Sequence, residues 1–312
     1  MSTPARWFTG LLAMLVFSCA AFALLHRGLY GWTIFVLAPV VVGGMASWIC
    51  RPATGARASG TGTLAVLAAL MLFFLLGAEG ALCIMMAAPL ALPLGALGGW
   101  LVYRVRPGRL ATPSAAMFLL LSPASILWDA KAPPPVYAVR TAIEIAATPE
   151  QVWKHVVAFS ELPEPREWYF QGGVAYPKRA HIDGTGPGAT RYCEFSTGPF
   201  VEPIETWDAP RLLRFRVTEN PAPLHEWSPW ARVLPKHLHG YMISKHGQFL
   251  LTPLPHNHTL LEGTTWYQHG LWPAEYWRWW SDAILHRIHL RVLTHIRTLA
   301  EQDAAADALT AR

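Results

Sequence analysis

Apolar residues dominate the first 130 positions in long runs that contain almost no charge. A helix needs about 20 apolar residues to cross a bilayer, and these runs approach or reach that length. The run 63–103 is interrupted only by Glu79, so we expect two spans there, joined by a tight hairpin. The pattern predicts an all-α transmembrane domain of four to five helices over 1–130. The expected spans are 7–25, 29–49, 63–81, 82–103 and 112–128, the last being the weakest.

Glu79 is the ionisable residue inside this apolar run, and two interpretations remain open. It is either an intramembrane proton or ligand site or a turn residue of the hairpin, and we favour the turn. The hairpin breaks either near Gly77–Gly80 or at Pro89 and Pro93. The Gly43-Gly44 pair is typical of close contact between membrane helices.

Arginine placement predicts the orientation of these spans, because positive residues accumulate on the cytoplasmic side. Arg27 falls on one side, and six other arginines fall on the opposite side: Arg6, Arg51, Arg57, Arg104, Arg106 and Arg109. We therefore expect a multi-pass protein of the inner (cytoplasmic) membrane with a cytoplasmic N-terminus. If 112–128 crosses, the C-terminal half lies on the extracytoplasmic side; if it does not, that half is cytoplasmic.

The second half alternates apolar and polar residues with a period of two, which predicts strands. After a Pro-rich linker at 131–135, a soluble domain is expected over 136–305, followed by a tail at 306–312. Thr148, Pro149 and Gln151 form a helix-start signal, and a long helix follows Pro273 to about 306. The expected strands are 136–147, 174–183, 189–197, 200–208, 211–219, 242–253 and 258–269.

This order of elements resembles the START/polyketide-cyclase-like (SRPBCC, helix-grip) superfamily over residues 136–305. The resemblance rests on Ile143-Glu-Ile-Ala-Ala-Thr-Pro-Glu-Gln-Val-Trp, on Gly186-Pro-Gly-Ala-Thr-Arg and on the long C-terminal helix. It implies an α+β fold in which a curved antiparallel sheet grips that helix around an apolar cavity. Members of the superfamily bind lipids, sterols, polyketides and hormones, and some are cyclases or aromatases. Fold alone does not decide the function.

Period two also predicts which side chains face this cavity. The superfamily's usual register turns the residue sets that begin at Arg191, Glu202 and Glu262 inward. That register places one arginine and two carboxylates in an apolar pocket, where charges must pair or shift their pKa. The candidate ligand-binding residues are Arg191, Cys193, Phe195, Glu202, Ile204, Phe215, Glu262, Thr264, Trp266, Trp280, Ile284 and Ile288.

Histidine and cysteine patterns give no specific metal signal. His237-Leu-His239 and His256-x-His258 are short pairs, whereas a zinc site needs three or four convergent ligands. On the last helix, the spacing separates His295 from His286, so we expect no single cluster among His286, His289 and His295. We expect neither a metal nor a cofactor.

Charge divides unevenly along the chain and excludes one class of partner. Residues 1–130 carry a net charge of +5 and residues 131–312 are neutral, so the basic pI of about 9.1 belongs to the membrane domain. A neutral soluble domain argues against nucleic acid as a partner. Trp227-Ser-Pro-Trp230 is a candidate lid over the pocket, and the Trp-rich start of the last helix is expected either to pack on the sheet or to touch the membrane interface.

The leading hypothesis is a membrane-tethered domain, of bacterial type, that binds a hydrophobic small molecule or lipid for transfer or sensing. The second is a polyketide cyclase-like or hydrolase-like enzyme with Glu202 or Glu262 as acid/base and Arg191 stabilising negative charge. The third is a non-catalytic docking module whose cavity is filled by its own side chains. The expected partners are the lipid bilayer and an apolar ligand, while the pattern identifies neither the ligand nor a protein partner.

Overall fold

The computed structural model describes residues 27–105, 134–230 and 238–310, with positions 8, 19, 23, 24 and 235. The expected spans at 7–25 and 112–128 lie outside these described stretches. The chain divides into two compact units. The helical unit comprises Met1–Pro133, Glu226–His237 and Gly270–Tyr276, and the sheet unit comprises Pro134–His225, Leu238–His269 and Trp277–Arg312.

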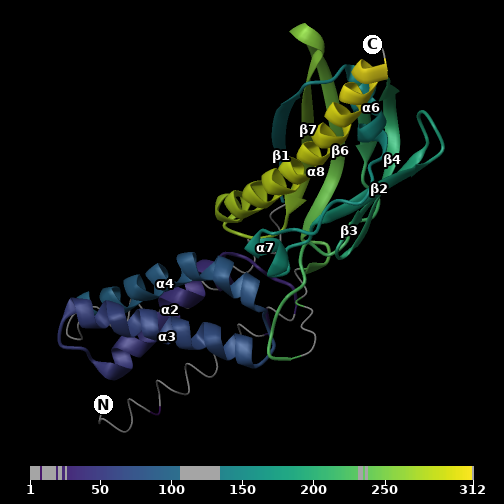
Figure 1. The fold of residues 1–312 in the computed structure, drawn as a ribbon. Coiled ribbons are helices and arrows are strands. Elements are labelled where there is room, and N and C mark those ends of the chain that lie inside the picture. The colour runs from purple at the N-terminus through teal and green to yellow at the C-terminus, as the bar shows by residue number, and fades with distance from the viewer. Residues whose placement is uncertain are drawn as a thin grey trace. The chain divides into compact units, whose positions relative to one another are not determined.

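Three apolar stretches of the helical unit are long enough to span a membrane. The π-helical turn η1 (Thr33–Leu37) continues directly into α2 (Ala38–Cys50), and α3 (Gly55–Leu75) and α4 (Ala81–Arg104) follow (Figure 1). The predicted hairpin near Gly77 is confirmed, because α3 ends before it and α4 begins after it. The alternative break at Pro89 and Pro93 is wrong, since both prolines lie inside α4.

The third span begins at Gly55 rather than at 63. Thr54 caps it, and its hydroxyl oxygen accepts a hydrogen bond from the Arg57 amide at 3.3 Å. This cap satisfies one of the backbone donors that every helix start leaves without a partner. The small and polar residues of the first two turns therefore form helix, although their low hydropathy resembles that of a loop.

Glycines let α2, α3 and α4 approach at backbone distance. A Cβ atom added to Gly43 or Gly62 would lie 2.1 Å from the carbonyl oxygen of Gly95, and one on Gly99 would lie 2.2 Å from that of Ala58. The close contact expected at Gly43 is confirmed. Small residues allow this packing in lipid, where apolar burial itself provides little drive for helix association.

The sheet unit contains a seven-stranded antiparallel sheet in the order β1-β7-β6-β5-β4-β3-β2. Each predicted strand is present, and most are slightly shorter than expected. The bounds are β1 (Val136–Ile145), β2 (Pro177–Asp183), β3 (Thr190–Phe195), β4 (Gly198–Asp208), β5 (Leu212–Arg216), β6 (Met242–Leu254) and β7 (His258–His269).

Short helices lie beside this sheet. The predicted cap of α6 (Pro149–Val157) is present in full, because Thr148 and Gln151 form a capping box with Pro149 in the first turn. The four-residue helix α7 (Trp168–Gln171) follows, and the turn η3 (Pro255–Asn257) joins β6 to β7.

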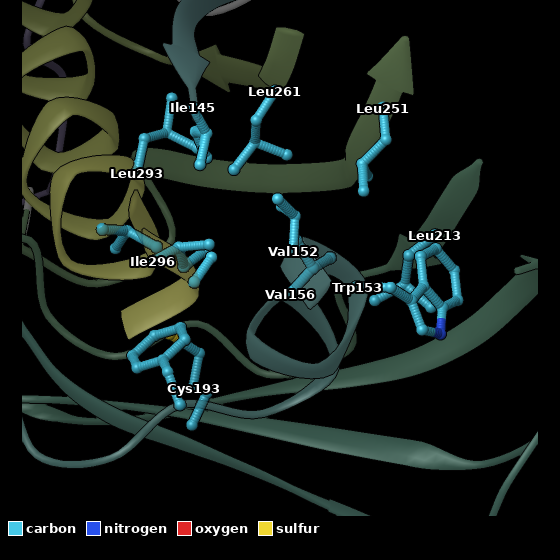
Figure 2. Packing of buried hydrophobic residues seen from close by; sticks show 14 of the residues in the cluster. Ile145, Val152, Trp153, Val156, Cys193, Leu213, Leu251, Leu261, Leu293 and Ile296 are labelled. Carbon is cyan, nitrogen blue, oxygen red and sulfur yellow. The ribbon is translucent and has the colours of Figure 1, made fainter. Parts of the chain in front are cut away.

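The long C-terminal helix α8 (Ala274–Thr310) runs along the sheet (Figure 1). Its apolar stripe buries Val292, Leu293 and Ile296 against side chains from β1, β5, β6, β7 and α6 (Figure 2). Fully burying an aliphatic side chain contributes roughly 1.5–3 kcal/mol, so this cluster holds the helix on the sheet. The resulting helix-grip architecture is the one that the sequence predicted.

Candidate functional site

The strands β3 and β4 turn alternate side chains toward the core, as predicted. Arg191 and Cys193 on β3, and Glu202 and Ile204 on β4, are all buried. Arg191 lies directly opposite Glu202 in the antiparallel register. Cross-strand neighbours have closely spaced Cβ atoms, so the register alone brings the two charges together.

The guanidinium of Arg191 is enclosed by protein groups. It forms an ion pair with the Glu202 carboxylate, and its Nε–H donates to the Val157 carbonyl oxygen at 3.2 Å. That carbonyl belongs to the last turn of α6, where backbone oxygens lack a partner within the helix. Three phenylalanine rings lie 5.5–5.6 Å from the guanidinium carbon, those of Phe159, Phe215 and Phe249. The predicted charge pair thus lies in an aromatic cage.

Burial shifts the acid–base behaviour of this site. It raises the pKa of the Glu202 carboxyl above its ordinary value, although the Arg191 guanidinium opposes the shift. Burial also acts to lower the pKa of Arg191, but the adjacent carboxylate outweighs it and the pKa is raised. The pKa of the Cys193 thiol is raised to about 12, mainly by burial. Cys193 is therefore an inert thiol at neutral pH, because the nucleophile is the thiolate.

Two further predicted residues lie near this cage. Phe215 is buried on β5, and its ring occupies the space that a Cβ atom on Gly247 would need, at 2.5 Å. Phe195 at the end of β3 is half-buried and packs edge-on against Phe200, with ring centroids 4.8 Å apart. The rings of Phe159 and Phe249 were not predicted as part of the site.

The predicted facing of β7 is wrong. Its odd-numbered residues face α8: Thr265 hydrogen-bonds His289 at 2.8 Å, and Tyr267 donates to Asp282. Successive side chains of a strand point to opposite faces, so Glu262, Thr264 and Trp266 face away from the helix.

Contacts of the even-numbered residues agree with this placement. Glu262 pairs with Arg140, whose side chain is largely exposed, and Arg214 lies 5.4 Å from the ring centroid of Trp266. Glu262 is therefore removed from the candidate pocket.

The remaining candidates lie on α8. Trp280, Ile284 and Ile288 are half-buried in the turns that precede Val292. Trp280 packs edge-on against Trp279, with ring centroids 4.8 Å apart. These candidates extend the apolar stripe of α8 toward the start of the helix.

Two histidines of α8 converge on one hydroxyl group, which the sequence analysis did not predict. The Nδ1 atoms of His286 and His289 lie 2.8 and 3.1 Å from the Thr141 hydroxyl. Burial, assisted by His286, lowers the pKa of His289 to about 4. His295 is separate, as predicted, and lies 3.4 Å from the Ser160 hydroxyl. Thr141 is one of the residues of β1 that alternate toward the helix, and this alternation is the sequence feature that could have indicated the cluster. Among the described residues no group of three or more His, Cys, Asp or Glu side chains is arranged to hold a metal ion.

The architecture defines a class before any family comparison: an antiparallel sheet that grips a long C-terminal helix. Residues 137–254 match the family model described as polyketide cyclase / dehydrase and lipid transport, so this segment is a domain of that SRPBCC-like family. The chain has no match among curated proteins.

Solved structures with a similar fold cover about half of the chain. Truncated norcoclaurine synthase from Thalictrum flavum is 13% identical, covering 54% of this chain and 96% of its own, with a TM-score of 0.34. A protein from Nitrosospira multiformis is 16% identical, covering 54% and 99%, with a TM-score of 0.34. An uncharacterised protein from Bacillus thuringiensis is 16% identical, covering 52% and 97%, with a TM-score of 0.34.

Proposed function

We propose that the sheet unit binds a hydrophobic small molecule or lipid on the inner face of its sheet, and that the apolar helices tether it to a membrane. The family match to polyketide cyclases and lipid-transport proteins supports this proposal most directly. The inner face is apolar at Cys193, Ile204 and Phe215, and its polar group is the Arg191–Glu202 pair. Ligand pockets combine apolar walls with a few placed polar groups in this way.

A membrane tether suits this ligand class. An apolar ligand that passes between a bilayer and a tethered domain avoids bulk water, where each exposed square ångström of apolar surface costs about 25 cal/mol. The three apolar stretches of the helical unit are the candidate tether. Transfer and sensing both use such an arrangement.

Photo-crosslinking of the full chain in lipid nanodiscs tests the binding proposal. A diazirine-bearing alkyl probe is expected to label inner-face peptides of β3, β4 and β5. Cys193→Trp fills the inner face and is expected to lower this labelling at least fivefold. Tyr192→Trp is the matched control, because Tyr192 is the neighbouring residue on the other face, where it stacks on His181 at 5.1 Å.

The position of the labelled peptides distinguishes probe bound by the sheet unit from probe dissolved in the lipid around the helices. Labelling confined to α2, α3 and α4, or equal labelling of the two variants, contradicts the proposal. Melting curves of both variants establish that each remains folded.

A second function, acid/base catalysis, is favoured by one observation. Glu202 is a buried carboxyl with a raised pKa and a hydrogen-bonded partner, Arg191. A raised pKa lets a carboxylic acid donate or accept a proton near neutral pH. Glu202→Gln is expected to abolish turnover of a cyclisation substrate while leaving probe labelling unchanged. Equal turnover in Glu202→Gln and the unsubstituted protein would exclude this role.

A further inference from the structure

The segment Glu226–Trp230, which we call the strap, packs on the hairpin between α3 and α4. It lies in the connection from β5 to β6, where the sequence suggested a lid, yet its residues belong to the helical unit. The Glu226 carboxylate accepts hydrogen bonds from the Leu82 and Cys83 amides at 3.1 and 2.9 Å. The Trp227 carbonyl accepts from the Ala81 amide at 2.9 Å.

The strap also contacts the end of α3. The indole N–H of Trp230 donates to the Leu75 carbonyl oxygen at 2.7 Å, and the Trp227 ring lies 5.6 Å from that of Phe74. The strap thus satisfies backbone groups at both helix ends that face each other across the turn. Such groups have no partner within their helices, and leaving them unpaired beside a bilayer core is costly.

The sequence of the turn fits the strap closely. A Cβ atom on Gly80 would lie 2.0–2.5 Å from atoms of the Glu226 side chain, and one on Gly77 would lie 2.9 Å from the Trp230 ring. Gly77 also has a positive φ of 68°. Glycine at both positions leaves the space that the strap side chains occupy. The sequence of the turn is therefore complementary to the sequence of the strap.

A second connection of the sheet unit is held in the same helical unit. The Trp272 amide donates to the Tyr30 carbonyl oxygen at 3.1 Å, and the Tyr276 hydroxyl donates to the Met86 carbonyl oxygen. The Tyr30 hydroxyl in turn donates to Glu79 in the α3–α4 turn at 2.9 Å. Tyr30 therefore links Trp272 to Glu79 in the same α3–α4 turn that the strap contacts.

Both connections leave the sheet at one end. The connection that carries the strap leads into Met242, and the other leaves His269, and these two residues are register partners. The first residue of β1, Val136, pairs with the adjacent Gln268. A single end of the sheet therefore carries the chain connections to the helical unit.

We infer that the strap is the built-in cap of the α3–α4 turn, held by the contacts of Glu226, Trp227 and Trp230, and that the strap and the sequence on either side of it lie on the side of the membrane at which α3 and α4 meet. Because α4 ends at Arg104 on the opposite side, this placement agrees with the expectation from the sequence that 112–128 crosses the bilayer. The apolar stretch 112–128 has 17 residues, the shortest length that spans a bilayer as a helix. This inference holds whether or not the sheet unit binds a ligand.

Disulfide trapping in native membranes tests the strap. The four native cysteines Cys19, Cys50, Cys83 and Cys193 are first replaced in the full chain. The pair Gly80→Cys/Glu226→Cys is then expected to oxidise. A Cβ atom on residue 80 would lie 2.5 Å from the Cβ atom of residue 226, so a small outward movement brings the two to the Cβ–Cβ distance of a disulfide. The matched pair Gly80→Cys/Thr185→Cys places the second thiol in an exposed turn of the sheet unit and is expected not to oxidise. The readout is a gel shift that a reductant reverses.

A second pair of cysteines tests the same contact without removing the Glu226 carboxylate that caps α4. Phe74→Cys/Trp227→Cys keeps Glu226 and is expected to crosslink with a short bis-maleimide. Failure of both strap pairs, or equal crosslinking of the Thr185 pair, overturns the inference.

Thiol labelling of intact cells tests the side of the membrane. Single cysteines at Ala78 in the α3–α4 turn and at Thr185 in the sheet unit are expected to react alike with a membrane-impermeant maleimide. A cysteine at Ala53, between α2 and α3, is expected to show the opposite accessibility. Thr185 reacting together with Ala53 rather than with Ala78 overturns the inference, even if probe binding by the sheet unit is intact.

Discussion

Arg191 is fully buried, and the charge it carries is stabilised by one carboxylate, one carbonyl and three aromatic rings. A buried pair is costly to break, because removing one partner leaves the other charge desolvated and unpaired. Replacing both partners with apolar groups of similar size removes that cost. The pair therefore fixes the register of β3 against β4 more than it adds net stability.

The first prediction follows from this asymmetry. Arg191→Met is expected to lower the free energy of unfolding by about 3–5 kcal/mol, and Arg191→Met/Glu202→Leu is expected to recover most of the loss. Denaturant unfolding of the full chain in detergent measures both. Arg179→Met, which breaks the exposed pair with Glu194, is the control and is expected to leave the midpoint unchanged. A double variant as unstable as Arg191→Met would contradict the prediction.

The second prediction concerns pH. His289 has a folded pKa of about 4 against an ordinary value of 6.5, so between these values the unfolded chain binds more protons than the folded one. Stability is therefore expected to rise with pH through this window and to be lost as the pH falls from 6.5 toward 4. Unfolding midpoints at several pH values measure the slope.

His289→Gln is expected to flatten that slope, because it removes the titrating ring. Equal slopes for His289→Gln and the unsubstituted protein would contradict the assignment.

At the residue scale, the alternation of apolar and polar residues predicts the inward face of β3 and β4 correctly, and that of β7 wrongly. Arg191 on β3 and Glu202 on β4 each alternate in step with an apolar residue, such as Ile204 on β4, so the inward face of both strands could be identified. On β7 the outward set contains Trp266, whereas the inward set contains Gly263 and Thr265. Gly263 faces Leu293 of α8 and Thr265 bonds His289, and neither contact is visible without the helix in place.

At the scale of elements, local signals determined most of the boundaries. The capping box fixed the start of α6, and strand alternation located all seven strands to within a few residues. The start of α3 was missed because its first turns contain Arg57, Ser59 and Gly60, which lower the hydropathy below that of a typical span. Those turns are helical because Thr54 caps them and Ala58 packs against Gly99.

The third prediction tests the packing of these helices. Gly95→Leu is expected to disrupt the contact of α4 with α3, since an added Cβ would lie 2.4 Å from a Val66 methyl group. Gly60→Leu is the matched control on α3, because a Cβ atom there meets nothing within 4 Å. Thermal unfolding in detergent is expected to show a drop of several degrees for Gly95→Leu alone. Equal melting temperatures would mean that the helices do not pack through Gly95.

At the scale of the whole molecule, the sequence predicts a membrane segment followed by a sheet domain. It does not predict that two segments within the sheet domain's sequence belong to the helical unit. Residues 226–237 and 270–276 lie within the sheet domain's sequence yet belong to the helical unit. Trp227 and Trp230 were visible as a conspicuous pair in the sequence. Their partners are backbone groups at the ends of α3 and α4, and hydropathy carries no information about which loop will cap a helix end.

The last prediction concerns the orientation of the whole chain. Arg51, Arg57 and Arg104 lie at the ends of α2, α3 and α4 away from the α3–α4 turn, and Arg27 lies on the other side. The positive side is expected to be cytoplasmic, so a reporter fused after Arg312 is expected on the extracytoplasmic side. Alkaline phosphatase, active outside the cytoplasm, and green fluorescent protein, fluorescent inside it, measure this placement.

Charge removal makes that prediction specific to the arginines. Arg51→Ala/Arg57→Ala/Arg104→Ala is expected to give a mixed population, because it weakens the bias that sets the orientation, whereas Arg27→Ala is expected to preserve the placement of the unsubstituted protein. Fluorescence without phosphatase activity in the unsubstituted fusion would contradict this placement, because either 112–128 does not cross the bilayer or every helix has the opposite orientation. The thiol accessibility of Ala78→Cys and Ala53→Cys distinguishes these two cases, since only a reversed orientation exchanges the accessible sides of the α3–α4 turn and of the loop between α2 and α3.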